Sequence, residues 1–172
     1  SFIDPKEAQK KLNLPRNPRD YTSIAVTTDD SNDEIVYASS MGDGVIQYKN
    51  GTPVQSYNEK NAFKETAGGY GSGYCYIDGL AFDKNGNLWM TSSEVNHAVL
   101  VLDKAGAWHR LDIEQLRGVY TINDILITST NDKWIYVPRN TPKLVMIPNS
   151  ESLDEVSSYE FTTLIDTDGK EL

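Results

Sequence analysis

Short apolar runs, separated by turn-forming polar residues, follow one another along most of the chain. In the middle of the sequence four such runs have the usual length of β-strands: 77–82, 88–91, 99–102 and 108–111. Asp, Asn and Gly fill the gaps between them, and these residues favour tight turns. The run 99–102 is apolar throughout, which is typical of a strand buried on both faces. The pattern predicts a four-stranded antiparallel sheet.

The same pattern returns 45 residues later. The motif Asn-Gly-Asn-Leu-Trp ends at Trp89, and its counterpart ends at Trp134. Forty-five residues is the length of one four-stranded propeller blade, so the repeat predicts consecutive blades. Strands of this later blade are expected at 122–127, 134–137, 144–147 and 158–161. An unrelated β-sandwich with evenly spaced strands is the alternative fold.

A looser copy of the pattern precedes these two. Its strands are expected at 23–27, 35–38, 45–48 and 54–57. In this copy Val36 takes the Trp position, and the first hairpin is longer than its counterparts. Near the N-terminus, Asp4 followed by Pro5 is typical of a helix start and predicts a short helix to about Leu12. The sequence therefore predicts an all-β chain, a β-propeller fragment of about three four-stranded antiparallel blades with a short N-terminal helix.

The predicted units follow one another without a gap. They are a helix and extended lead-in at 1–19, blade 1 at 20–62, a Gly/Tyr-rich interblade loop at 63–76, blade 2 at 77–117, blade 3 at 118–165, and the start of the next interblade connection at 166–172. Closed propellers have four to eight blades, so three blades would leave two sheet faces uncovered. These faces are expected to expose residues such as Leu100, Leu102, Leu144 and Ile147. We therefore expect a fragment of a longer protein that self-associates through uncovered blade faces.

Composition narrows the possible partners. The net charge is −9 and the isoelectric point is near 4.6, which argues against binding to nucleic acid or to an anionic membrane. Cys75 is the single cysteine, so an internal disulfide and a Cys-based zinc cluster are excluded. No apolar run approaches the ~20 residues of a membrane-spanning helix.

Several stretches resemble a known family. The segments NPRDYTSIAV, YASSMGDGVIQYKNG, GLAFDKNGNLWMTSS and NDKWIYVPR resemble the two-component regulator propeller repeats of Bacteroidetes. The core of that repeat, D-x-x-G-x-L-W-x-x-T, matches Asp83, Gly86, Leu88, Trp89 and, approximately, Ser92. With its Trp-Ile-x-x-Pro-Arg stretch, the chain looks most like the PorZ-like branch, whose members are large exported proteins of type IX secretion. The similarity extends over about residues 17–168.

Strand direction predicts which loops lie together, and the resemblance to propellers implies that the face formed by these loops binds a ligand. The connectors between blades and the loops between second and third strands should share one face of the disc. The candidate ligand-binding residues on these segments are Tyr70, Tyr74, Tyr76, His97, Tyr120 and Arg139. Tyrosines on a glycine-rich scaffold suit sugar rings or protein partners, although such a stretch is more often a plain linker. No catalytic residue and no cofactor are predicted. No metal site is predicted either, because the two histidines lack metal-binding spacing.

The resemblance implies a function for the parent protein. It implies a non-enzymatic propeller at the periplasm or outer-membrane surface of a Gram-negative bacterium, associated with type IX secretion or cell-surface assembly. Its expected partner is a glycan, lipopolysaccharide or a protein. The first alternative is a periplasmic oligosaccharide-sensing domain of a hybrid two-component histidine kinase. The second is an enzyme of the propeller lyase type.

Overall fold

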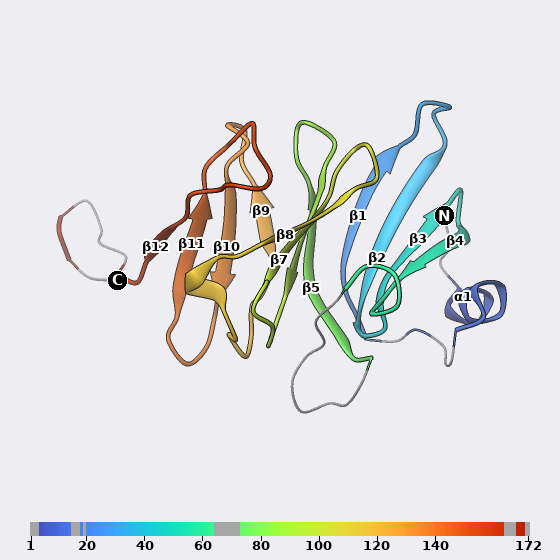
Figure 1. Cartoon of the computed structure of the whole chain (residues 1–172), viewed down its shortest axis with the longest axis horizontal. Coiled ribbons are helices and arrows are strands. Elements are labelled where there is room, and N and C mark those ends of the chain that lie inside the picture. The colour runs from blue at the N-terminus through green and yellow to red at the C-terminus, as the bar shows by residue number, and fades with distance from the viewer. Residues whose placement is uncertain (1–3, 15–17, 19, 64–72, 164–167, 171–172) are drawn as a thin grey trace.

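Three four-stranded antiparallel sheets follow one another along the chain, and we call them blades 1, 2 and 3 (Figure 1). The computed structural model describes residues 4–14, 18, 20–63, 73–163 and 168–170. Blade 1 contains β1 (Tyr21–Thr28), β2 (Glu34–Gly42), β3 (Gly44–Lys49) and β4 (Thr52–Tyr57). Blade 2 contains β5 (Cys75–Phe82), β6 (Leu88–Ser92), β7 (Val99–Leu102) and β8 (Trp108–Leu111). Blade 3 contains β9 (Ile125–Ile127), β10 (Lys133–Val137), β11 (Lys143–Ile147) and β12 (Tyr159–Phe161).

The predicted all-β fold and the short helix are both confirmed. Helix α1 (Pro5–Leu12) begins after Asp4, whose side chain accepts a hydrogen bond from the Lys6 N–H at 2.9 Å. A 3-10 turn, η1 (Glu114–Leu116), lies between blades 2 and 3. The end of β2 also pairs with the start of β5, where Met41 faces Tyr76. Backbone pairing therefore continues from blade 1 into blade 2, whereas blade 3 forms a sheet of its own.

The hairpin between the first and second strands has the same geometry in all three blades. A backbone N–H donates to the carbonyl four residues later in the pairs Asp29–Asp33, Asp83–Asn87 and Thr128–Asp132, at 3.1, 2.9 and 2.9 Å. The residue before each acceptor has a positive φ; these residues are Asn32, Gly86 and Asn131. Gly and Asn tolerate that left-handed conformation, which explains why the turn recurs with these residue types. The sequence pattern predicts a longer first hairpin in blade 1. That prediction is wrong, because the three hairpins have the same length.

This shared turn also corrects the assignment of the Trp position. Six residues after the start of the turn stand Ile35 in blade 1, Trp89 in blade 2 and Trp134 in blade 3. Val36 instead lies on the opposite face of its sheet, in the cluster that contains Ala8 of α1. The sequence-based alignment was wrong by one residue because it assigned an extra residue to the first hairpin.

Two apolar layers hold neighbouring blades together. Between blades 1 and 2, Ile35 and Tyr37 belong to one buried cluster with Leu88, Leu100 and Leu102. Between blades 2 and 3 the corresponding cluster forms around the indole of Trp89; its other members include Val99, Val101, Ile125, Ile135, Val145 and Ile147. Burial of aliphatic and aromatic side chains on facing sheets is the main force that joins the blades.

The uncovered faces differ from the prediction. Leu100, Leu102 and Ile147 are buried between blades, because they point toward the preceding blade. Helix α1 covers part of the outer face of blade 1, so this face is not fully open. The fully open face belongs to blade 3. Its side chains are Leu126, Trp134, Tyr136, Leu144, Met146, Tyr159 and Phe161, which the strand register places on one side of the sheet.

Trp89 makes three kinds of contact in its layer. The side chain is 1% exposed, and its Nε1–H donates to Asp83 Oδ2 at 2.9 Å. The Nζ of buried Lys133 lies 4.5 Å from the centre of the ring, in a cation–π contact. Trp134, the equivalent residue of blade 3, is only partly buried and stacks on Phe161 at 5.4 Å.

We predict that Trp89→Phe lowers the free energy of unfolding by about 2–3 kcal/mol, because it removes the hydrogen bond and part of the buried volume. Urea denaturation followed by circular dichroism measures this change. The matched control, Trp134→Phe, should cost less than about 1 kcal/mol, because its ring faces the open side of blade 3. Equal losses for the two variants would show that Trp89 has no special role in blade packing.

Candidate functional site

The connector between blades 2 and 3 lies at one end of the molecule, together with the loops between second and third strands (lower end in Figure 1). We call this end the connector face. The hairpins between first and second strands lie at the opposite end, which we call the hairpin face. This arrangement follows from the alternating direction of strands in each blade, as the sequence predicts.

Three of the predicted tyrosines come together on the connector face, and we call Tyr74, Tyr76 and Tyr120 the tyrosine cluster. The rings of Tyr74 and Tyr76 meet edge to face, with centroids 6.5 Å apart. Burial raises the pKa of Tyr76, and Asp78, Tyr74, Tyr120 and Glu94 are near enough to raise it further. Tyr120 is 56% exposed, so the cluster is open to solvent. The arrangement offers aromatic surface beside two acidic side chains.

A hydrogen-bonded network beneath the cluster joins blade 2 to the connector that leads to blade 3. The Ser93 hydroxyl donates to Asp78 Oδ2 at 2.8 Å and accepts from the Ile122 N–H at 2.8 Å. In the next layer, the Gly79 N–H donates to Thr91 Oγ1 at 2.9 Å, and that hydroxyl donates to the Asn123 carbonyl at 3.0 Å. These bonds fix the position of the connector and hence of Tyr120.

Glu94 has an unusual backbone in the same region. Its φ is 63°, which is rare for a residue other than glycine, asparagine or aspartate. Its N–H donates to the Val119 carbonyl at 2.8 Å, next to Tyr120. The Oε1 atom is buried and has no hydrogen-bond partner among the described residues. Strained backbone and an unpaired buried oxygen are features that functional sites often show.

The remaining predicted site residues are Tyr70, His97 and Arg139. Tyr70 lies outside the described residues. His97 lies in the loop between β6 and β7 and is near enough to lower the pKa of Asp112, although the Arg117 hydrogen bond is the main cause of that shift. Arg139 is exposed in the hairpin between β10 and β11.

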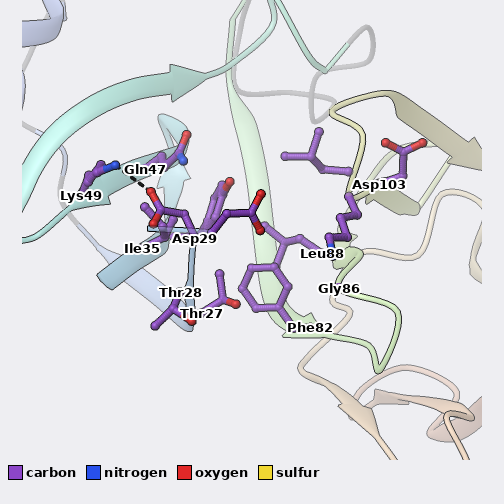
Figure 2. Close-up of a pocket in the computed structure, with 14 residues that line it drawn as sticks. Thr27, Thr28, Asp29, Ile35, Gln47, Lys49, Phe82, Gly86, Leu88 and Asp103 are labelled. Atoms are coloured by element: carbon purple, nitrogen blue, oxygen red, sulfur yellow. Dashed lines mark hydrogen bonds and ion pairs between the residues drawn. The ribbon is translucent and has the colours of Figure 1, made fainter. Parts of the chain in front are cut away.

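A cleft of about 560 Å³ opens on the hairpin face, between blades 1 and 2. Figure 2 shows Thr27, Gln47 and Lys49 on one side of it, and Phe82 and Leu88 on the other. Sequence reasoning did not find this cleft, because it placed all candidate residues on the connector face. The signal was present in the sequence, since an aliphatic residue replaces Trp in the first repeat, but its consequence for packing between blades 1 and 2 was not considered.

The described residues contain no group of three or more His, Cys, Asp or Glu side chains that could hold a metal ion. Among the same residues, no helix has the length and apolar composition that crossing a membrane requires. Cys75 is buried, and burial raises the pKa of its thiol to about 12, which keeps the sulfur protonated and unreactive at neutral pH.

Solved structures with the same fold match nearly the whole chain. PorZ, described as an essential bacterial surface component of the type IX secretion system of Porphyromonas gingivalis, superposes with a TM-score of 0.80 at 20% identity. The match covers 99% of this chain and 23% of PorZ. The extracellular domain of a putative hybrid two-component system from B. thetaiotaomicron matches with a TM-score of 0.52 at 16% identity, over 91% of this chain and 18% of that chain.

These likenesses show that the chain has the propeller fold. Both kinds of protein named by the sequence resemblance are represented among the structural neighbours. The chain spans about a quarter of the length of PorZ. No protein-family model matches the sequence, and no curated protein matches it.

The carboxyl group of Asp78 makes stability depend on pH. Its usual pKa is 3.8, and burial raises the folded-state pKa to about 7, although the Ser93 hydrogen bonds lower it. A raised carboxyl pKa means that the folded chain binds more protons than the unfolded chain between these values. Ionisation of the buried Asp78 carboxyl therefore lowers the free energy of unfolding. This loss is absent below pH about 4, grows as the pH rises, and is complete above about 7.

We predict that Asp78→Asn raises the free energy of unfolding at pH 8 by about 2–4 kcal/mol and by clearly less at pH 5. Urea denaturation at the two pH values measures the difference. Asp112→Asn is the control, because this exposed carboxyl has a lowered pKa and is ionised at both pH values. A stability gain for Asp78→Asn that is equal at pH 5 and 8 would contradict the prediction.

Proposed function

We propose that the chain is a non-enzymatic binding segment of an exported PorZ-like propeller protein, and that its connector face contacts a partner. The observation that carries the proposal is the tyrosine cluster, which the fold assembles from the start of β5 and from the connector between blades 2 and 3. The likeness to PorZ over nearly the whole chain supports the assignment to this kind of protein.

The chemistry of the cluster favours a protein partner among those expected. Tyrosine is enriched at protein interfaces because it offers apolar contact area and a hydrogen-bonding hydroxyl. Glu94 lies beside the rings and favours basic side chains of a partner over anionic groups. Lipopolysaccharide carries anionic groups, so we consider it a less favoured partner than a protein with a basic surface.

A sensor domain of a hybrid two-component system is the second candidate. It is supported by the likeness to the extracellular domain from B. thetaiotaomicron, which has a lower TM-score than the match to PorZ. The parent reading frame separates the two proposals. A sorting domain would support the PorZ-like assignment, whereas a transmembrane helix followed by a kinase would support the sensor.

Self-association through the open face of blade 3 is a further part of the proposal. The exposed fractions on this face reach 62% for Leu126 and 53% for Tyr159. In blade 2 the equivalent face contains Trp89, Val99 and Val101, which blade 3 buries. An apolar face of this kind favours association with a sheet of a second copy when nothing else covers it.

We predict that Tyr74→Ala combined with Tyr120→Ala weakens partner binding by about tenfold or more, because aromatic anchors dominate interface energetics. Biolayer interferometry with purified type IX secretion components and with lipopolysaccharide, both from the organism that encodes the chain, measures the affinities. Thr28→Ala on the hairpin face is the control and should bind as the unchanged chain does. Unaltered affinity for the tyrosine variant would remove the connector face as the contact surface.

We predict that Leu126→Glu with Tyr159→Glu converts a self-associated chain into a monomer, since like charges would then face each other across the contact. Light scattering coupled to size-exclusion chromatography measures the mass. Thr28→Glu on blade 1 serves as the control and should leave association unchanged. If the unchanged chain is a stable monomer that binds no hydrophobic dye, the proposed self-association is wrong.

A further inference from the structure

The cleft between blades 1 and 2 exists because blade 1 lacks the tryptophan of the other two blades. Ile35, Trp89 and Trp134 occupy the same position after the shared hairpin turn. The indole of Trp89 fills the space between blades 2 and 3 and is 1% exposed. At the equivalent place between blades 1 and 2, the smaller side chain of Ile35 lines a cleft of about 560 Å³.

The residues around this position are also polar where blade 2 is apolar. The strand register places Thr27 opposite Ile35, as it places Ala81 opposite Trp89. On the third strand, Lys49 pairs with Ile35 where Val101 pairs with Trp89. Two residues earlier, Gln47 of blade 1 stands where blade 2 has Val99. An interface that needed only to hold two blades together would be apolar at these positions, as it is between blades 2 and 3.

The walls of the cleft combine an aromatic ring with hydrogen-bonding groups. Phe82 is partly exposed, and its ring meets that of Tyr37 edge to face, with centroids 5.8 Å apart. The Tyr57 hydroxyl donates to Gln47 Oε1 at 3.0 Å, so the amide NH₂ of Gln47 remains the donor toward other groups. Thr27 adds a hydroxyl on the same side. A ring that contacts C–H groups, beside amide and hydroxyl groups that bond to hydroxyls, suits a sugar.

The charge of the lining disfavours a strongly anionic ligand. Lys49 is already paired with Asp29 at 2.6 Å and with Asp33 at 2.9 Å. Three acidic and two basic side chains line the cleft, so its net charge is slightly negative. A phosphate or a sugar acid would meet repulsion here, whereas an uncharged polyol would not. The volume lies within the range of roughly 300–1,000 Å³ that small-molecule sites occupy.

We propose that the cleft between blades 1 and 2 binds a neutral carbohydrate. The site lies on the hairpin face and uses no residue of the tyrosine cluster. It is therefore independent of the proposed contact on the connector face. The ligand's ring would lie against Phe82, and its hydroxyl groups would bond to Thr27 and Gln47.

The test measures binding of three neutral trisaccharides, maltotriose, cellotriose and mannotriose, to the whole chain by isothermal titration calorimetry and saturation-transfer NMR. We expect saturable binding of at least one of them. Ile35→Trp should weaken that binding by about tenfold or more, because the indole would fill the cleft as it does between blades 2 and 3. Ile35→Val keeps the cleft open and should bind as the unchanged chain does.

Two further variants separate the possible explanations. Thr27→Ala with Gln47→Val copies the residues of blade 2 and should also weaken binding by about tenfold, without filling the cleft. Tyr120→Ala, at the other end, should leave sugar binding unchanged even if it abolishes the proposed protein contact. Glucose 6-phosphate and trigalacturonate are titrated in parallel as anionic probes. The inference is overturned if no neutral trisaccharide binds, if Ile35→Trp binds equally well, or if only these anionic probes bind.

Discussion

The structure depends on how one turn positions one large side chain between two sheets. Asp83 accepts hydrogen bonds from the N–H groups of Asn85 and Asn87, which closes the hairpin, and from the indole of Trp89, which orients the ring. The same carboxylate thus connects local backbone geometry to blade packing. Blade spacing follows from it, because the indole and the stacked Lys133 fill the layer between blades 2 and 3. Where blade 1 keeps the turn but has Ile35 in place of the ring, the spacing leaves a cleft.

Most of the fold was predictable from the sequence because the information is local. Turn residues and alternating or continuous apolar runs recur at a constant distance, so all twelve described strands lie at or close to the expected positions. The helix was marked by Asp4 and Pro5 in the same local way. Side-chain direction was harder to predict, since a shift of one residue reverses the face of a strand. That shift explains the error at Val36, and the unknown direction explains why Leu100, Leu102 and Ile147 were expected on open faces.

The site was predictable only in part, for a related reason. Strand direction placed Tyr74, Tyr76 and Tyr120 at one end of the blades, and the structure brings these three together. Periodicity contains no information about which side chains approach one another, so Asp78, Ser93 and Glu94 were not among the candidate site residues. The cleft was missed because the sequence shows that blade 1 lacks the Trp, but not whether neighbouring side chains fill the space that the ring would occupy. The connector face presents the tyrosine cluster, whereas the hairpin face presents the cleft.

The continuous pairing of β2 with β5 divides the molecule into two mechanical units. Backbone hydrogen bonds cross from blade 1 to blade 2, so separating these blades requires breaking main-chain bonds as well as an apolar layer. Blade 3 is joined to blade 2 by side-chain packing, by the bonds of its connector and by a few bonds that cross between the blades, such as the Lys84 N–H donating to Asn131 Oδ1 at 2.9 Å, but the strands of the two blades do not pair with each other. We therefore expect a force applied along the chain, or a spontaneous opening of the native state, to separate blades 2 and 3 before blades 1 and 2. The cleft lies between blades 1 and 2, which stay joined by strand pairing. Tyr120 lies on the connector at the boundary between blades 2 and 3, which we expect to open first.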